Sequence, residues 1–332
     1  MSVEIKVASV EPIRHTFNRV SRRFGSNKPA SRYQEASFDL QPRDNFHYRP
    51  IWDPEHEIYD ERRTKVKMVD WDELKDPRQY YYASYVMNRA KLQETIENNF
   101  AFIEKHDLLN QLPSEKIAEI ESSLLPLRHV EWAANLNNCF ITAYGFGTPI
   151  TQGAMFNTTD RLGMAQYLSK IGLLLDRNSG SSLARAKDTW LTNESWQPLR
   201  RSIESMLVQK DWFELFLAQN LIQDAILYPV MYRQYQNNLS NSGDSSLAML
   251  LEFQHAWYPD NSKWVDACIK RVASESVSNT NLLACWSKKW IGNVVEAINP
   301  LLSISNENLA RERLEISLSE LNTRLIKLGI TN

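Results

Sequence analysis

The chain has 332 residues, and its 38 basic and 40 acidic side chains give a net charge of -2. No broad positive field therefore favours nucleic acid or an anionic membrane as a partner. Only ten residues are glycine, whereas an average chain has about 7% glycine, and tight β-turns depend on it. An all-β fold is disfavoured.

The cysteines, the N-terminus and the apolar runs of the sequence indicate the cellular compartment of the protein. Cys139, Cys268 and Cys285 are odd in number and show no C-x-x-C spacing, so they fit neither a disulfide framework nor a zinc knuckle. The N-terminus lacks a secretory signal, and no run of about 18 apolar residues could span a bilayer. We expect a soluble cytoplasmic protein.

The first 65 residues differ from the rest of the chain. They contain five of the 13 prolines and no helical apolar repeat longer than two turns, but more aromatic residues than a disordered tail usually has. We predict an extended arm over residues 1–65 that docks on another chain, and a helical domain over 66–332. A flexible tail, or a layer packed on its own bundle, is the alternative. The candidate interface residues are Arg22, Arg23, Tyr33, Tyr48 and Trp52.

Long helices are predicted from Asp76 onward. In residues 78–106, positions recur at spacings of four and three, which places them on one helical stripe; these positions are Val86, Ala90, Gln93, Glu97, Phe100 and Glu104. Pro113 and Ser114 open a short helix, and Pro126 begins the next long one. That helix has the same stepping at Leu127, Glu131, Ala134, Asn138 and Ile141. The stripes thus place Glu97, Glu104 and Glu131 on inward faces.

The rest of the chain continues the helical pattern. Residues 160–176 form a clear apolar face, with Asp160 as a candidate N-cap. An aromatic helix at 210–236 has Asp224 and Tyr228 within it, and Pro229 should kink it. Further helices are predicted at about 246–257, 261–275, 279–298 and 305–328. The predicted class is all-α: a ferritin-like long-helix bundle with additional C-terminal helices.

A bundle of this kind invites comparison with a di-iron site. Such a site takes one Glu from each of two helices and a Glu-x-x-His pair from each of two others. Only Glu252 and His255 supply such a pair, and Ala134 stands three residues after Glu131, where a second imidazole would be needed. The incomplete set Glu104, Glu131, Glu252 and His255 is therefore a weak alternative to a chain without metal ligands. Pro259 also places His255 in a last helical turn.

The inward carboxylates are more simply explained as buried groups that pair with arginine or accept hydrogen bonds from Asn and Tyr, without a metal. Unpaired burial would be costly, and Arg89, Arg128 and Asn138 are plausible partners. The chain has no dinucleotide, P-loop or nucleophile-elbow motif, and Cys139 fits a small buried hydrophobe. We therefore assign no catalytic and no cofactor-binding residue.

Several blocks resemble one family, the β subunits of the oxygenase component of bacterial multicomponent phenol hydroxylases, which belong with the toluene and methane monooxygenases. The likeness extends over nearly the whole chain, and no block is a catalytic motif. The blocks are residues 22–37, 45–57, 76–86, 126–138, 160–176, 210–221 and 263–270.

The resemblance implies a structural subunit of an (αβγ)2 hydroxylase that converts phenol to catechol. In that family the α subunit carries the di-iron centre, an NADH-dependent reductase with FAD and a 2Fe-2S cluster supplies electrons, and a small regulatory protein completes the system. The β subunit has no iron. Two alternatives are a self-contained carboxylate-bridged di-iron oxidase or oxygenase, and a helical scaffold outside oxygenase chemistry.

Overall fold

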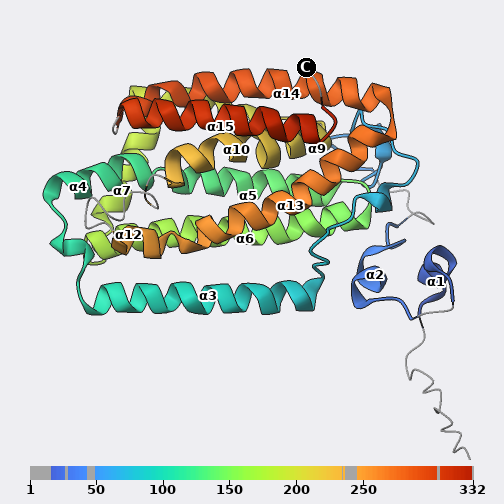
Figure 1. Cartoon of the computed structure of the whole chain (residues 1–332), viewed down its shortest axis with the longest axis horizontal. Helices are drawn as coiled ribbons and strands as arrows, with labels where there is room; N and C mark the ends of the chain where they lie inside the picture. The colour runs from blue at the N-terminus through green and yellow to red at the C-terminus, as the bar shows by residue number, and fades with distance from the viewer. Residues whose placement is uncertain are drawn as a thin grey trace, which may run out of the picture.

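The structure is a computed structural model, and it describes residues 16–26, 29–42, 49–233, 235, 245–304 and 307–330. Within these ranges every regular element is a helix, which confirms the predicted all-α class. Figure 1 shows the long helices running roughly along one axis in stacked layers, with α3 on the outside of the bundle. The long helices are α3 (Tyr82–Lys105), α5 (Leu127–Tyr144), α6 (Thr148–Leu175), α13 (Glu252–Glu275), α14 (Val277–Ile298) and α15 (Glu307–Lys327).

Shorter helices connect and cap the long ones. They are α4 (Ser114–Glu119), α7 (Ser181–Thr192), α8 (Gln197–Leu207), α9 (Trp212–Phe216), α10 (Asp224–Leu227) and α12 (Ser245–Leu250). Three π-helical stretches occur at Ile120–Leu124, Leu217–Gln223 and Tyr228–Tyr232, and short 3-10 turns at Glu61–Arg63, Trp71–Glu73, Leu109–Gln111, Glu194–Trp196 and Asn299–Ile304. No helix in the described ranges is long and apolar enough to cross a membrane.

The buried centre of the bundle is the segment from Trp212 to Tyr232, in which every residue is buried. It passes from α9 through a π-helical stretch into α10 and a second π-helical stretch. Pro229 lies at the start of the second stretch. The missing backbone donor is thus accommodated by local widening of the helix, where the sequence suggested a kink.

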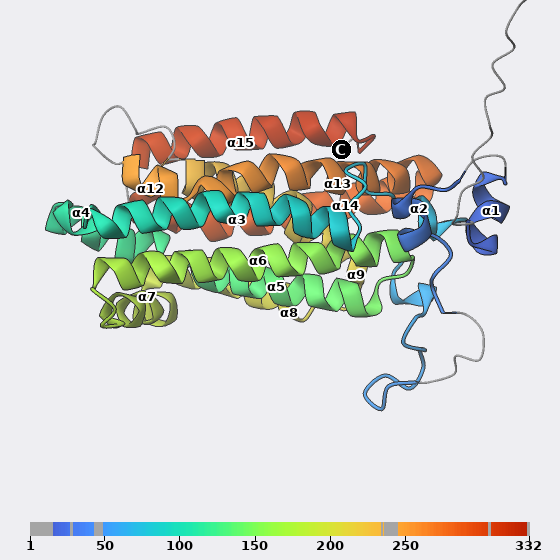
Figure 2. The ribbon, with the colours of Figure 1, turned by 90° about the horizontal axis from the view of Figure 1, so that it is seen from below.

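Glycine and proline set the break between α5 and α6. Gly145 caps α5, Gly147 has φ +97°, and Pro149 lies in the first turn of α6. A side chain at Gly147 would approach the Trp71 backbone oxygen to 2.8 Å. These residues interrupt the helical path, and the break folds α5 back on α6 as an antiparallel pair (Figure 2).

Three sequence-based details are wrong. Helix α6 begins 12 residues before Asp160, so this residue is a buried mid-helix side chain, not an N-cap. Helix α13 runs through Pro259, so His255 lies in its first turn. Cys139 is exposed.

The stripe predicted for α3 is also displaced. Val86, Ala90, Gln93, Glu97 and Glu104 are exposed, and only Phe100 of that set is buried. The face that packs on the bundle contains Tyr85, Ile96, Phe100 and Ile103. Because α3 lies on the outside of the bundle, only a narrow stripe is buried, and a shift of one residue, which turns the helix by about 100°, moves a side chain from this stripe into solvent.

The described part of residues 16–65 contains two short helices, α1 (Asn18–Phe24) and α2 (Arg32–Ser37). Ser31 begins α2 with a capping box that it forms with Gln34. Both helices lie at one end of the bundle (Figure 1). The arm is therefore not extended throughout.

Candidate functional site

Four helices place one residue each at the same point of the core. These are Glu131 from α5, Arg161 from α6, Asp224 from α10 and Trp257 from α13, all buried. The Arg161 Nη1 donates to Glu131 Oε2 over 2.9 Å, and its Nη2 donates to Asp224. The Trp257 ring lies 4.4 Å from the guanidinium carbon, a cation–π distance. A single cation thus occupies the centre of the bundle.

Two tyrosines complete the surroundings of Glu131. The hydroxyls of Tyr228 and Tyr232 each donate to Glu131 Oε1 over 2.9 Å. Arg161 Nη1 also lies 3.1 Å from the Tyr228 hydroxyl, and the Met164 sulfur lies 3.2 Å from it. Both oxygens of the Glu131 carboxylate therefore have donors within the protein, as a buried charge requires.

The charge balance at this centre is uneven. One guanidinium faces two carboxylates, so one negative charge is left over when both are ionised. Burial raises the pKa of Asp224 to about 6, although the nearby Arg161 opposes the shift. Burial also disfavours the charge on Arg161, but attraction by Asp224 raises its pKa above the ordinary value. The centre is thus one buried cation that faces two carboxylates, of which Asp224 has a raised pKa.

The donor set does not suit a pair of metal ions. Glu131 and Asp224 take the places of the two lone carboxylates that such a site needs, so Glu131 is not the remnant of a Glu-x-x-His pair that its spacing to Ala134 suggested. The other two helices, however, present Arg161 with Met164 and Gln254 with Trp257, at the three-residue spacing where Glu-x-x-His pairs are required. A guanidinium is always charged and has no lone pair to donate. No group of three or more His, Cys, Asp or Glu in the described ranges could hold a metal ion.

Buried amides extend the polar centre toward one end. Asn157 Nδ2 donates to Asn220 Oδ1 over 2.9 Å, and Asn220 Nδ2 donates to Asn138 Oδ1 over 3.1 Å. Asn137 donates to Gln219 over 2.9 Å. The inward position predicted for Asn138 is confirmed. Its partners are amides on α6 and on the buried segment, not a carboxylate.

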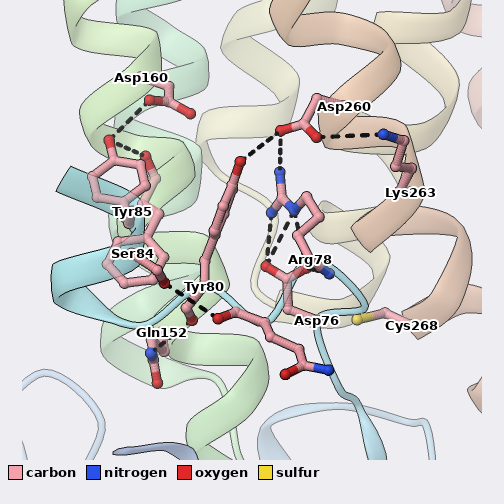
Figure 3. Close-up of polar contacts among 12 residues, drawn as sticks. Asp76, Arg78, Tyr80, Ser84, Tyr85, Gln152, Asp160, Asp260, Lys263 and Cys268 are labelled. Atoms are coloured by element: carbon pink, nitrogen blue, oxygen red, sulfur yellow. Dashed lines mark hydrogen bonds and ion pairs between the residues drawn. The ribbon is translucent and has the colours of Figure 1, made fainter. Parts of the chain in front are cut away.

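A second charged cluster ties the start of α3 to the bundle, and Figure 3 shows its Tyr85–Asp160 hydrogen bond beside the contact of Arg78 with Asp260. Arg89 donates to both oxygens of Asp160, and Tyr85 and the Trp257 indole donate to the same carboxylate over 2.8 Å. Trp257 therefore contacts both clusters, since its ring also lies over the central guanidinium. On the outer side, Arg78 and Tyr80 each donate to Asp260 over 3.3 Å.

Comparisons with known proteins identify a family and several relatives of this chain. A model of the methane, phenol and alkene hydroxylases matches residues 52–276. The chain is 46% identical over 330 residues to the phenol 2-monooxygenase oxygenase component DmpL of Pseudomonas sp. (strain CF600), covering 99% of this chain and 98% of that protein. The toluene-4-monooxygenase hydroxylase β subunit of Ectopseudomonas mendocina is 24% identical, with 77% and 79% covered.

A solved phenol hydroxylase structure contains a chain with the same fold. The chain superposes on phenol hydroxylase from Pseudomonas sp. OX1 with a TM-score of 0.93 and 43% identity, covering 99% of both chains. The chain belongs to the methane, phenol and alkene hydroxylase family. It is a hydroxylase subunit, and the family resemblance seen in its sequence is confirmed.

In this hydroxylase subunit the weak metal set is not brought together. Glu131 is fully buried, whereas Glu104 and Glu252 are exposed on α3 and α13. His255 is half-buried, and its Nε2 has no hydrogen-bond partner among the residues that the structure describes. Burial lowers the pKa of His255 to about 4, with a further contribution from Arg233.

The predicted pairing of buried carboxylates with arginine is confirmed, but the partners differ. Arg161 pairs with Glu131 and Asp224, whereas Arg89 pairs with Asp160. Arg128 makes one long contact, 3.4 Å to a backbone oxygen, and none to a carboxylate in the described ranges. Glu97 pairs with Lys170 on the surface.

Arg161 was missed, although its signal was in the sequence. It lies three residues before Met164, the first member of the stripe predicted for 160–176. Extending that stripe by three residues toward the N-terminus places Arg161 on the inward face. A buried arginine there must have carboxylate partners.

The five candidate interface residues of the hydroxylase subunit have different surroundings. Arg22 is exposed, and the Trp52 side chain is 63% exposed beside Tyr144. Arg23 pairs with Asp39 over 2.8 Å, and the Tyr33 hydroxyl accepts from the Asp76 backbone over 2.8 Å. Tyr48 lies outside the described residues.

Proposed function

We propose that this chain is the non-catalytic structural β subunit of a cytoplasmic multicomponent phenol hydroxylase. The enzyme hydroxylates phenol to catechol with O2 and electrons from NADH, and its di-iron centre lies in the partner α subunit. The assembly is (αβγ)2 and works with a small regulatory protein and a reductase that carries FAD and a 2Fe-2S cluster. The relatives named as phenol 2-monooxygenase oxygenase components, at 46% and 47% identity, support this substrate.

The position of Arg161 is the observation that carries the non-catalytic role. The guanidinium fills the point where four helices converge, and it already engages Glu131 and Asp224. Iron at this point would have to displace a buried cation and would gain neither of the required imidazoles. The chain therefore keeps the bundle of an oxygenase and uses its centre for packing.

A metal count with an activity assay tests the proposal. The chain is expressed alone, and also together with the other hydroxylase subunits, in iron-supplemented medium. We expect less than about 0.1 iron per chain and no catechol from the isolated chain, and about two irons per α subunit in the complex. Two irons per isolated chain, together with catechol formation by that chain and the reductase alone, would overturn it.

Substituting a residue of the weak metal set tests, within the complex, whether this chain helps to bind iron. His255→Gln removes the one imidazole of the weak metal set while keeping a polar side chain of similar length. We expect unchanged iron content and unchanged catechol formation in the complex that contains this variant. His106→Gln, at the exposed histidine that follows α3, is the matched control. A loss of iron with the first substitution alone would contradict the proposal.

We also propose that residues 1–65 act as a unit that docks on another hydroxylase subunit, distinct from the helical domain at 66–332. The exposed side chains of Arg22 and Trp52 support this assignment. Combined Arg22→Ala and Trp52→Ala should reduce the yield of assembled hydroxylase at least about fivefold and leave the isolated chain folded by circular dichroism. Undiminished assembly would show that the arm packs on its own bundle.

A further inference from the structure

Helices α5 and α6 lie side by side as an antiparallel pair (Figure 2). Side chains of both helices line a groove. The groove has a volume of about 580 Å³, and its walls are mainly apolar. Trp132 lies on the α5 side with half of its surface exposed, and Leu162 and Leu173 lie on the α6 side. Large apolar patches rimmed by polar residues are typical of interaction sites.

The same face continues beyond the groove. Leu136, one turn after Trp132 on α5, is 40% exposed, and Met155 on α6 is 51% exposed. Cys139 follows Leu136 by three residues and is also exposed. Residues three and four apart share one side of a helix. The exposed side of the pair is therefore apolar over several turns.

Arg128, which lines the groove, indicates the chemistry of the partner that would bind there. It is half-buried, and its Nε is buried without a hydrogen-bond partner among the described residues. In the same ranges its side chain makes one hydrogen bond, of 3.4 Å from Nη2 to the Leu183 backbone oxygen. Burial lowers the pKa of Arg128, and no described carboxylate opposes the shift. A desolvated guanidinium in an apolar groove calls for an anion from outside the chain.

We propose that the α5–α6 groove docks a helix of the larger hydroxylase subunit, which inserts apolar side chains around Trp132 and pairs a carboxylate with Arg128. This inference rests on the proposed function and names the surface that it uses. A bidentate carboxylate satisfies the planar guanidinium, and a tryptophan in a desolvated groove is a frequent energetic anchor of an interface.

A second copy of this chain fits the groove less well. In a symmetric dimer the same surface meets itself, so a carboxylate for Arg128 would have to come from α5 or α6. Glu131 and Asp160, the two acids of residues 127–175, are buried and paired with arginine. Of the acids that border the groove, Asp176 after α6 accepts from Ser179 and Ser182, and Glu97 pairs with Lys170. Self-association through this pair of helices would leave Arg128 unpaired, which favours a different polypeptide.

Cysteine labelling gives a direct readout. Cys139 lies on the proposed docking face, Cys285 is exposed on α14, and Cys268 is buried. Maleimide labelling of the isolated chain should modify Cys139 and Cys285. In the assembled hydroxylase we expect labelling of Cys139 to slow at least about tenfold, while Cys285 serves as the internal reference. The modified peptides are quantified by mass spectrometry.

Substitutions then test the two anchors. Arg128→Glu and Trp132→Ala should each weaken binding of the larger subunit by about 30-fold or more, the lower range for a buried charge pair or an interface anchor. Arg201→Glu and Val277→Ala, at exposed positions on other helices, are the matched controls and should bind as the parent chain does. Circular dichroism verifies that every variant is folded.

The outcomes separate this inference from the proposed function. If no complex with the larger subunit forms even with the parent chain, the proposed function fails and the docking inference falls with it. If the complex forms but Cys139 labels at the free rate and both substitutions bind normally, the docking face is wrong while the function stands. A native mass of twice the chain for the isolated protein, with Cys139 protected, would assign the groove to a second copy and overturn the inference.

Discussion

The guanidinium of Arg161 and the carboxylate of Glu131 form a hydrogen-bonded ion pair of 2.9 Å, and both side chains are fully buried. The pair joins α6 to α5 at the point where a di-iron bundle would hold its metals. Asp224 and Trp257 enclose the same guanidinium from two further helices. One cation thereby links all four helices of the core.

Replacing Arg161 by Met should destabilise the chain by about 3–5 kcal/mol, because it leaves buried carboxylates without their counter-charge. Urea denaturation followed by circular dichroism measures the loss. Arg200→Met is the control, since Arg200 forms an exposed i,i+4 pair with Glu204, and such pairs contribute about 0.3–0.5 kcal/mol.

The cause of that loss is tested by neutralising the carboxylates as well. In the triple variant Arg161→Met, Glu131→Gln and Asp224→Asn, no buried charge remains unpaired, so most of the stability should return. A triple variant as unstable as the single one would mean that Arg161 acts through packing volume and not through charge.

The two tyrosines that donate to Glu131 should behave as a coupled pair. Tyr228→Phe and Tyr232→Phe each remove one hydrogen bond to a charged acceptor, at about 1.5–3 kcal/mol. Because both bonds end on the same oxygen, the double variant should depart from additivity by about 0.5 kcal/mol or more. Tyr82→Phe, at a side chain that is 77% exposed, should change stability by less than about 0.5 kcal/mol. Strict additivity would contradict the shared acceptor.

His129 should make the chain less stable in mild acid. Burial lowers its pKa to about 4 in the folded state, helped by the nearby Arg128, whereas an unfolded histidine has a pKa near 6.5. As the pH falls from about 6.5 to about 4, the unfolded chain therefore takes up a proton that the folded chain does not, and stability declines.

The measurement compares denaturation of the parent chain and His129→Gln at several pH values. The variant should gain stability relative to the parent across this window and show a constant difference above about pH 7. His106→Gln, at an exposed position, is the control for the substitution itself. A flat difference for His129→Gln would mean that the imidazole is protonated in the folded chain.

The sequence was sufficient for the helical class and for most helix starts, because proline and glycine mark them directly. Pro126 precedes α5 and Pro198 lies in the first turn of α8. The inward direction of Glu131 also followed from period alone. In each case the local signal and the burial of the helix agree.

Sequence reasoning failed where tertiary packing decided the outcome. On α3 a narrow buried stripe left Glu97 and Glu104 in solvent, although the apolar period allowed them an inward position. Pro259 remains inside α13 because contacts of the long helix outweigh the local cost. The partner of Glu131 could not be identified, since Arg161 lies 30 residues away and meets it only after α6 folds back along α5.

Gly153 permits the close approach of α6 and α13. A methyl group at this position would lie 2.5 Å from Cε2 of the fully buried Trp264 ring, so Gly153→Ala should cost about 1–3 kcal/mol through overpacking. At Gly163, ten residues further along α6, such a methyl group would meet no side chain and no other helix within 4 Å in the described part of the chain. Gly163→Ala should instead stabilise the chain by about 0.4–1 kcal/mol, because alanine restricts the unfolded chain and favours the helix. The same substitution at these two positions of α6 should therefore change the stability in opposite directions, as measured by thermal or urea denaturation. A stabilising Gly153→Ala would mean that Trp264 can shift, and that the contact between α6 and α13 is looser than this packing requires.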